Sequence, residues 1–569
     1  MKVGAAYTPR STFQKSARLS RPVKSALDMA RTRLWVACFT FSFCLLAVFV
    51  RLAGLTLFQG ESNPGLTAAT SQNVMTGRAE ILDRHGELLA TTIMTSSLYA
   101  NARKIQHPEE AAKKLHGIFP GIKSTVFEKR LKSGKSFVWM ARHLTPKMQS
   151  KVLELGIPGL GFVRDYRRVY PQKNLVSHVV GFTDIDNQGV AGIESSFDQR
   201  LRTNPDPVRL SLDIKLQHIV RDELQRGIEE FGCIGAGAVV MDINTGEVLS
   251  MVSLPDFDAN KPGKATSQQL FNQSTLGVYE LGSIMKIPNT AMGLESGKVK
   301  LNTTYNTSEP LKVGRFSISD YRADYGVINV AQIFVHSSNK GSARIALDVG
   351  SEGQKTFLKK LGFLDKVNIE LPEVSSPLVP KRWRDARTIT ISYGYGLSVS
   401  PLQALTGIAS IAGGGRLLKP TLLKRESIIP FGERIISEKN SKRLLQLMRF
   451  VVTEGTSRKA DVPGYFVAGK TGTADLLIKG RYDKSRSSTT FIGILGETAE
   501  TPKYAIIVRL DDPQRLKKTF GFNAAGWNAA PVAGRIMARL TGFAGLRPQE
   551  DKSQVLDPFF RQVSFRKKK

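Results

Sequence analysis

Cysteine and histidine are scarce in this chain of 569 residues, and their scarcity excludes two kinds of structure. Two of the three cysteines, Cys38 and Cys44, lie inside one apolar run. Cys233 is then the single cysteine of the remaining chain, so no intrachain disulfide can form there. The seven histidines show no ligand spacing such as H-E-x-x-H. We therefore expect no metal site.

Acidic residues are also few, with 49 Asp and Glu against 81 Lys and Arg and a formal net charge of +32 at pH 7. Such an excess of positive charge raises nucleic acid as a partner. The basic residues are scattered, however, except at the two termini, and an anionic membrane surface or cell wall accounts for them equally well. We expect no nucleic-acid partner.

One long apolar run stands out in this otherwise polar composition. Residues 34–58 contain no charge except Arg51, and a span of about 20 apolar residues is the length that a membrane-crossing helix needs. Residues 1–33 carry eight Lys and Arg against only Asp28, so this basic tail is expected in the cytoplasm. The basic region is too long for a cleaved signal peptide, and the run lacks a small-residue cleavage site. We predict an uncleaved single-pass anchor, with everything from about residue 59 outside the membrane.

Two folded domains are expected beyond the anchor, with a boundary at Pro205 and Pro207. Residues 59–205, which we call the pedestal, begin with a linker from Gly60 to Thr76. The pedestal then mixes short strand-like and helix-like pieces. The expected strands are Arg78–Leu82 and Val179–Thr183, and the expected helices are Glu109–His116 and Lys147–Leu155.

The second domain is assigned to residues 206–545, followed by a basic tail at 546–569. It opens with an amphipathic helix signal at Asp213–Glu229. A hairpin follows, because two β-rich runs flank the turn residues Asn244 to Gly246. Later strands are expected at Tyr465–Ala468, Thr489–Leu495 and Ala505–Leu510. The predicted fold class is α+β, with helices packed on a largely antiparallel sheet.

Three short patterns in the second domain carry chemistry, and we call them the first, second and third motifs. They are Ser283 with Lys286, Ser337 with Asn339, and Lys470-Thr471-Gly472-Thr473. This ordered trio is a known signature of penicillin-binding proteins and β-lactamases. Single matches are weak, since Ser337 and Lys340 also fit the first pattern.

Gly282 favours Ser283 as the nucleophile, because it allows a tight turn into a helix that would hold Ser283 and Lys286 on one face. A lysine amine with a depressed pKa can then take the serine proton. The Ser283 and Thr473 N–H groups are candidates for an oxyanion hole.

In the third motif, Lys470 is expected at the end of an apolar strand. Thr471 and Thr473 are placed to bind a substrate carboxylate, and Gly472 removes side-chain bulk beside them. Ser337 offers a hydroxyl for proton relay and Asn339 an amide for orienting substrate, although a simple helix cap or turn also explains that pair.

A phosphate-binding loop is the main rival, because Gly464 to Thr471 matches its pattern letter for letter. The variable positions of that match look like a strand rather than a loop, and no helix begins after Thr471. His336 beside Ser337 suggests a Ser-His pair, but a polar residue at a helix end is the better interpretation. We expect no nucleotide site.

With these residues assembled, the chain resembles the class B penicillin-binding proteins, and most closely the division-specific septal D,D-transpeptidases. The resemblance covers nearly everything from Arg78 to about Pro513. Outside the three motifs it includes residues 78–86, 168–171, 189–194 and 394–403, and residues 467–474 match around the third motif. Two departures are Leu281, where many members have Pro, and Pro288, which lies one place late and is expected to bend the helix.

The resemblance implies that Ser283 is acylated, that Lys286 is its base, and that no cofactor is needed. It also implies a donor stem peptide ending in D-Ala-D-Ala and inhibition by β-lactam antibiotics. The implied location is the inner membrane, with the catalytic domain in the periplasm. The implied partners are a polytopic glycosyltransferase and other division proteins. An elongation-type transpeptidase and a non-catalytic division scaffold stay open as alternatives.

Overall fold

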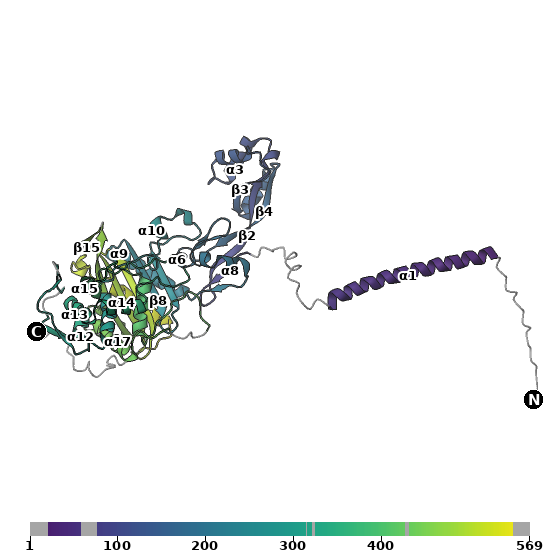
Figure 1. Ribbon diagram of the computed structural model, residues 1–569. Helices are drawn as coiled ribbons and strands as arrows, with labels where there is room; N and C mark the ends of the chain where they lie inside the picture. The colour runs from purple at the N-terminus through teal and green to yellow at the C-terminus, as the bar shows by residue number, and fades with distance from the viewer. Residues whose placement is uncertain are drawn as a thin grey trace, which may run out of the picture. The chain divides into compact units, whose positions relative to one another are not determined.

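The computed structural model describes residues 21–57, 77–313, 316–320, 325–426, 432–478 and 480–549. It divides into two units, residues 1–76 and 77–569. Its first unit contains helix α1 (Arg21–Leu57), in which Arg31–Val50 is long and apolar enough to cross a membrane (Figure 1). The expected linker and most of the two expected basic tails lie outside the described residues.

The pedestal begins the second unit with a mixed five-stranded sheet in which the long strand β2 is central. The strand order is β3-β2-β1-β7, and β4 also pairs with β2. The bounds are β1 (Ile81–Leu82), β2 (Leu88–Ala100), β3 (Val138–Leu144), β4 (Leu160–Val169) and β7 (Val208–Arg209). Strand β7 follows the expected boundary at Pro205 and Pro207, and it joins this sheet by pairing with β1. Helices α3 (Pro108–Ile118), α4 (Ser124–Leu131) and α5 (Pro146–Glu154) form a core of their own with β2 and β3 (Figure 1).

The expected pedestal helices are confirmed by α3 and α5, but the expected strands are largely wrong. Of Arg78–Leu82, only β1 is a strand. The segment Val179–Thr183 is divided between helix α6 (Ser177–Val180) and strand β5 (Phe182–Thr183). Gly181 lies between them at φ 76°, which ends the helix in a backbone conformation that glycine tolerates. The remaining elements are β6 (Gly189–Ala191), α7 (Gly192–Ser196) and α8 (Asp198–Thr203).

A buried ion-pair cluster joins distant parts of the pedestal. The Glu194 carboxylate bonds the guanidinium of Arg78 through one oxygen, and through the other it accepts from Arg168 Nε at 2.6 Å. Arg78 Nη1 also lies 2.6 Å from Asp198 Oδ1. Arg78, Arg168 and Glu194 are all buried. Three of the sequence segments that carry the family resemblance therefore meet at this cluster.

The second domain is built on a five-stranded, wholly antiparallel sheet, as predicted. Its order is β14-β15-β16-β8-β9. The hairpin β8 (Gly235–Asp242) and β9 (Val248–Leu254) is confirmed. Strands β14 (Phe466–Ile478), β15 (Arg481–Gly496) and β16 (Pro502–Asp511) all extend beyond the predicted ranges.

Helices cover both faces of this sheet because the β8 side chains alternate between two apolar cores. Ala238 and Val240 face α9 (Ile214–Phe231) and α18 (Ala529–Phe543). Val239 and Met241 face the core that contains α11 (Lys286–Glu295), α16 (Pro401–Ala412) and α17 (Glu438–Thr453). Helix α9 confirms the predicted opening helix, with Asp213 as its N-cap.

Smaller elements complete the second domain around the α11 side of the sheet. The helices are α10 (Ser267–Leu270), α12 (Val330–His336), α13 (Asn339–Val349), α14 (Ser351–Lys360) and α15 (Asp385–Ser392). The strands are β10 (Thr304–Asn306), β11 (Leu311–Val313), β12 (Phe316–Ile318) and β13 (Val327–Asn329). The middle of β14 and the beginnings of α11 and α13 are the parts that position the site.

Candidate active site

The first motif lies on a tight helical turn that precedes α11. Gly282 adopts φ 53°, a conformation that is unfavourable for residues with a Cβ. Residues Gly282–Met285 form a 3₁₀ turn, and the α-helix begins at Lys286. The turn brings the Lys286 amine to 2.8 Å from the Ser283 hydroxyl, so the two groups meet as the sequence predicted.

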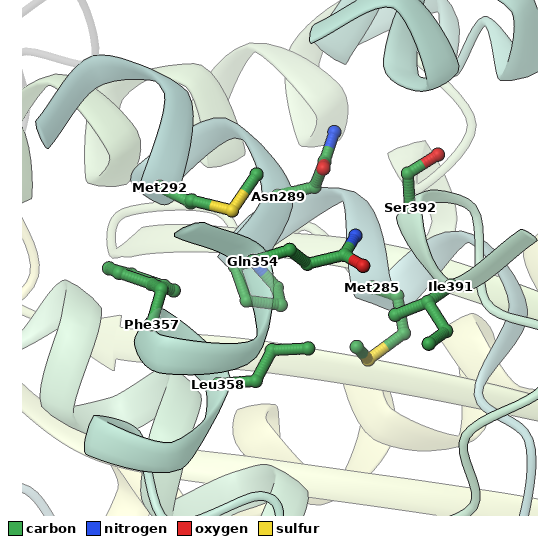
Figure 2. A pocket seen from close by; sticks show the side chains of 9 residues that line it. Met285, Asn289, Met292, Gln354, Phe357, Leu358, Ile391 and Ser392 are labelled. Atoms are coloured by element: carbon green, nitrogen blue, oxygen red, sulfur yellow. The ribbon is translucent and has the colours of Figure 1, made fainter. Parts of the chain in front are cut away.

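Pro288 does not bend α11 in its middle, because it falls in the first turn of that helix, where N–H groups have no intrahelical partner. Figure 2 shows a small cavity on this side of α11, lined by Met285, Pro288, Asn289, Met292, Gln354, Phe357, Leu358, Ile391 and Ser392. Ser283 is not among these residues, so the cavity is separate from the motifs.

The second motif lies in the junction between α12 and α13. Ser337 ends α12 in the left-handed region, at φ 61°. Ser338 is the N-cap of α13, and Asn339 is the first residue of that helix. Lys286 Nζ lies 2.7 Å from Asn339 Oδ1, 2.9 Å from the Ser337 carbonyl oxygen and 3.1 Å from Ser337 Oγ. The junction is therefore more than a helix cap, since it also holds the amine of the first motif.

The third motif lies inside strand β14 rather than after its end, which corrects the prediction for Lys470. The strand continues through Gly472 and Thr473 to Ile478, so the phosphate-loop geometry is absent from this described segment. Lys470 Nζ donates to Ser337 Oγ at 2.9 Å. The Thr471 hydroxyl lies 2.7 Å from the Thr456 hydroxyl, and Thr473 Oγ1 accepts from the Ala525 N–H at 3.1 Å.

Two glycines allow the first and third motifs to approach each other at backbone distance. A Cβ on Gly282 would lie 2.4 Å from the Thr473 carbonyl oxygen. A Cβ on Gly472 would lie 2.1 Å from the Leu281 carbonyl oxygen. Neither distance is possible for a real side chain, so both glycines keep the nucleophile turn against β14.

Two buried lysines share the Ser337 hydroxyl, and their charges determine the chemistry. Burial lowers the pKa of Lys286 well below its ordinary value, the charge of Lys470 lowers it further, and Asp320 opposes them. Burial also lowers the pKa of Lys470 to about 7. A neutral Lys286 amine keeps a lone pair, and can accept the Ser283 proton.

Sequence reasoning missed two side chains that touch the motifs. Thr456 bonds Thr471, and the Asp320 carboxylate accepts from Ser338 and Asn339. Neither residue stands in a recognisable pattern, and Asp320 comes 17 positions before Ser337. His336, in contrast, ends α12 and stacks on Tyr325 at 5.2 Å between ring centroids, as expected for a residue at a helix end.

Comparison with known families agrees with this geometry. Residues 236–538 match the penicillin binding protein transpeptidase domain, and residues 74–221 match the penicillin-binding protein dimerisation domain. The latter match covers most of the pedestal.

Similar proteins are related along almost the whole chain. The probable peptidoglycan D,D-transpeptidase FtsI of Caulobacter vibrioides is 33% identical over 94% of this chain and 92% of its own length. The peptidoglycan D,D-transpeptidase FtsI of Escherichia coli is 29% identical over 84% of this chain and 85% of its own.

A solved structure shows the same fold. Penicillin-binding protein 3 of Mycobacterium tuberculosis, complexed with aztreonam, superposes with a TM-score of 0.65 at 26% identity, over 83% of this chain and 97% of that one. With the fold, the matched domains and the relatives in agreement, this chain belongs to the penicillin-binding protein family defined by the transpeptidase domain.

Proposed function

We propose that this protein is a peptidoglycan D,D-transpeptidase that cross-links stem peptides through an acyl-enzyme on Ser283. The observation that carries the proposal is the 2.8 Å contact between the Ser283 hydroxyl and the amine of Lys286, a lysine that is buried and held toward its neutral form. A serine hydroxyl beside a buried neutral amine fits an activated nucleophile better than it fits a purely structural pair.

Acylation follows from this arrangement. Neutral Lys286 takes the Ser283 proton as Oγ attacks the carbonyl carbon of the penultimate D-Ala of the donor peptide. When the tetrahedral intermediate collapses, the peptide C–N bond breaks and the terminal D-Ala leaves. Its nitrogen receives a proton through Ser337, whose hydroxyl lies within hydrogen-bond distance of both lysines.

The second half-reaction transfers the peptide to an acceptor. An amine of a neighbouring strand attacks the Ser283 ester, a new amide bond forms, and Ser283 Oγ leaves with a proton. The amine needs to lose a proton as it attacks, and Lys286 is the base within reach. If water attacked the Ser283 ester in place of the amine, the ester would be hydrolysed and no cross-link would form.

Lys470, Thr471 and Thr473 are proposed to bind the terminal carboxylate of the donor, and Asn339 to orient its amide. Lys470 contributes positive charge in its protonated form, and Gly472 keeps β14 close to the nucleophile turn. A β-lactam carries a carboxylate at the equivalent place and would acylate Ser283 in the same way. The tuberculosis relative, which is solved with aztreonam and with ampicillin, supports this reading.

The relatives named FtsI support a role in division, and this sets the proposed topology and partners. We propose residues 1–33 as a cytoplasmic tail, 34–58 as the anchor, 59–205 as the pedestal, 206–545 as a periplasmic transpeptidase domain and 546–569 as a basic tail. A polytopic glycosyltransferase and other division proteins are the proposed partners, with the pedestal and anchor as their binding surfaces.

Intact-mass analysis of the purified protein after a fluorescent penicillin tests the nucleophile. We expect one stable adduct on the wild type and none on Ser283→Ala. Ser296→Ala is the matched control, because Ser296 directly follows α11 and its hydroxyl donates only to the Gly293 carbonyl among the described contacts. Release of D-Ala from a donor peptide should follow the same pattern.

A non-catalytic scaffold and a β-lactamase each predict a different result. A division scaffold without catalysis would give no adduct on well-folded wild type. A β-lactamase would give an adduct that disappears within minutes, because efficient hydrolysis removes it. An adduct that persists for hours on the wild type alone contradicts both.

A further inference from the structure

A carboxylate outside the three motifs holds the second motif in place. Asp320 follows strand β12, and its side chain accepts three hydrogen bonds from successive residues. The Ser338 hydroxyl donates at 2.8 Å, the Asn339 N–H at 2.5 Å and the Lys340 N–H at 3.1 Å. The last two belong to the first turn of α13, where N–H groups lack intrahelical partners and negative charge is favourable.

The same segment also fixes the orientation of the Asn339 amide. Asn339 Nδ2 donates to the Ser319 carbonyl oxygen at 3.2 Å. A carbonyl can only accept, so this bond turns the amide oxygen the other way, toward Lys286 Nζ at 2.7 Å. The Ser319 carbonyl therefore determines which atom of Asn339 meets the base, while Asp320 holds the Asn339 backbone.

The backbone just before this segment is in a costly conformation. Ser337 lies in the left-handed region, which is unfavourable for a residue with a side chain and persists only where neighbours hold it. Its carbonyl oxygen accepts from Lys286, and its hydroxyl lies near both lysines. The bonds from Asp320 to the next three residues hold the chain immediately after that position.

We propose that Asp320 is a positioning residue for the transpeptidase reaction, holding Ser337 and Asn339 where they engage Lys286. The inference rests on the proposed function, because it assigns Asp320 a part in the acylation of Ser283. Asp320 touches neither Ser283 nor the expected place of the substrate, so it acts through the second motif.

The pH dependence of acylation distinguishes this role from a merely structural one, because the charge of Asp320 acts on the pKa of Lys286. The charged groups that act on Lys286 are Lys470 from β14, which favours the neutral amine, and Asp320, which favours the protonated one. His336 and Lys340 are the neighbouring titratable residues on α12 and α13. Removing the Asp320 charge leaves Lys470 unopposed and lowers the pKa of Lys286.

The test compares full-length Asp320→Asn, Asp320→Ala and Asp320→Glu with the wild type. The measurement is the acylation rate constant with a fluorescent penicillin between about pH 5 and about pH 9, a range that brackets the ordinary histidine pKa and the Lys470 pKa of about 7. Asp348→Asn is the matched control. Asp348 lies in the last turn of α13, the helix whose first turn Asp320 contacts, and it accepts from the Tyr305 hydroxyl. Ser283→Ala is the reference for loss of the nucleophile.

We expect Asp320→Ala to lower the acylation rate constant by roughly 100-fold, the scale of a displaced catalytic group, with the adduct still on Ser283. Asp320→Asn keeps one acceptor oxygen, so it should lose less, and its rate should begin to rise at lower pH than that of the wild type. Asp320→Glu should recover part of the rate and the wild-type pH profile. Asp348→Asn should match the wild type.

Two results would overturn the inference. One is a wild-type rate and pH profile for Asp320→Ala. The other is a loss of rate in both neutral variants that matches their loss of folded protein in thermal melts, with an unchanged pH profile. Failure of the proposed function itself looks different, because the wild type would then form no adduct that depends on Ser283.

Discussion

At the scale of single residues, the state of Lys286 decides when Ser283 can react. The amine has to be neutral to accept the serine proton, so the acylation rate should rise with pH until the pKa of Lys286 is passed. Burial and Lys470 move that pKa downward from 10.5, which places the rise well below the ordinary titration of lysine.

Replacing Lys470 by Gln should move this rise to higher pH. The substitution removes a positive charge beside Lys286, so the amine holds its proton more strongly and becomes neutral only at higher pH. The measurement is the rate constant of acylation by a fluorescent penicillin at a series of pH values. The pH at which this rate constant rises can be read separately from any overall loss of rate. Lys442→Gln, an exposed lysine on α17 paired with Glu438, is the control and should not move it. An unchanged position in the Lys470 variant would contradict the coupling.

The candidate site could be predicted from sequence as far as its residues form local patterns. Ser283 and Lys286 are three positions apart, and the helical geometry alone brings them together. Asp320 and Thr456 could not be found this way, because their contacts depend on how a loop and a helix end approach the motifs from elsewhere in the chain. Such non-local contacts leave no spacing in the sequence.

At the scale of elements, local patterns predicted helices better than strands. The amphipathic helices α3, α5 and α9 occur where the pattern places them. Strand β14 is longer than predicted because its second half contains polar and small residues, and pairing with β15 keeps it extended. Val179 and Val180 favour a strand by propensity, yet they lie buried in the short helix α6, where tertiary packing outweighs that preference.

Glu194 should be the residue on which the pedestal elements depend most. Glu194→Ala leaves Arg78 and Arg168 buried without their shared carboxylate, and breaking a buried pair in this way costs about 3–5 kcal/mol. Thermal or urea unfolding, followed by a probe in the pedestal, measures the loss. Glu110→Gln, which removes an exposed pair with Lys114, is the control and should leave the transition unchanged. A wild-type transition for Glu194→Ala would show that the cluster does not stabilise the pedestal.

At the scale of the whole molecule, bonds between the pedestal and the second domain make residues 77–549 more than two tethered domains. Arg84 pairs with Glu247, and the Gly192 N–H donates to the Glu373 carboxylate at 3.1 Å. Asn260 Nδ2 donates to the Tyr170 carbonyl oxygen at 2.9 Å. Because these contacts tie pedestal loops to the second domain, a partner that binds the pedestal has a physical route to that domain.

The helix α1 should determine where the whole molecule resides. Its apolar side chains between Leu34 and Val50 are exposed, and burying such a surface in a bilayer is strongly favourable. Full-length protein should stay with membranes after an alkaline wash and need detergent for release, whereas a variant that begins at Gly77 should remain in the soluble fraction. The variant should still form the penicillin adduct, because no residue of the three motifs lies before Gly77. Release of the full chain by the wash alone would show that α1 does not span the membrane. Loss of the adduct in a soluble, folded variant would show instead that the anchor contributes to the site.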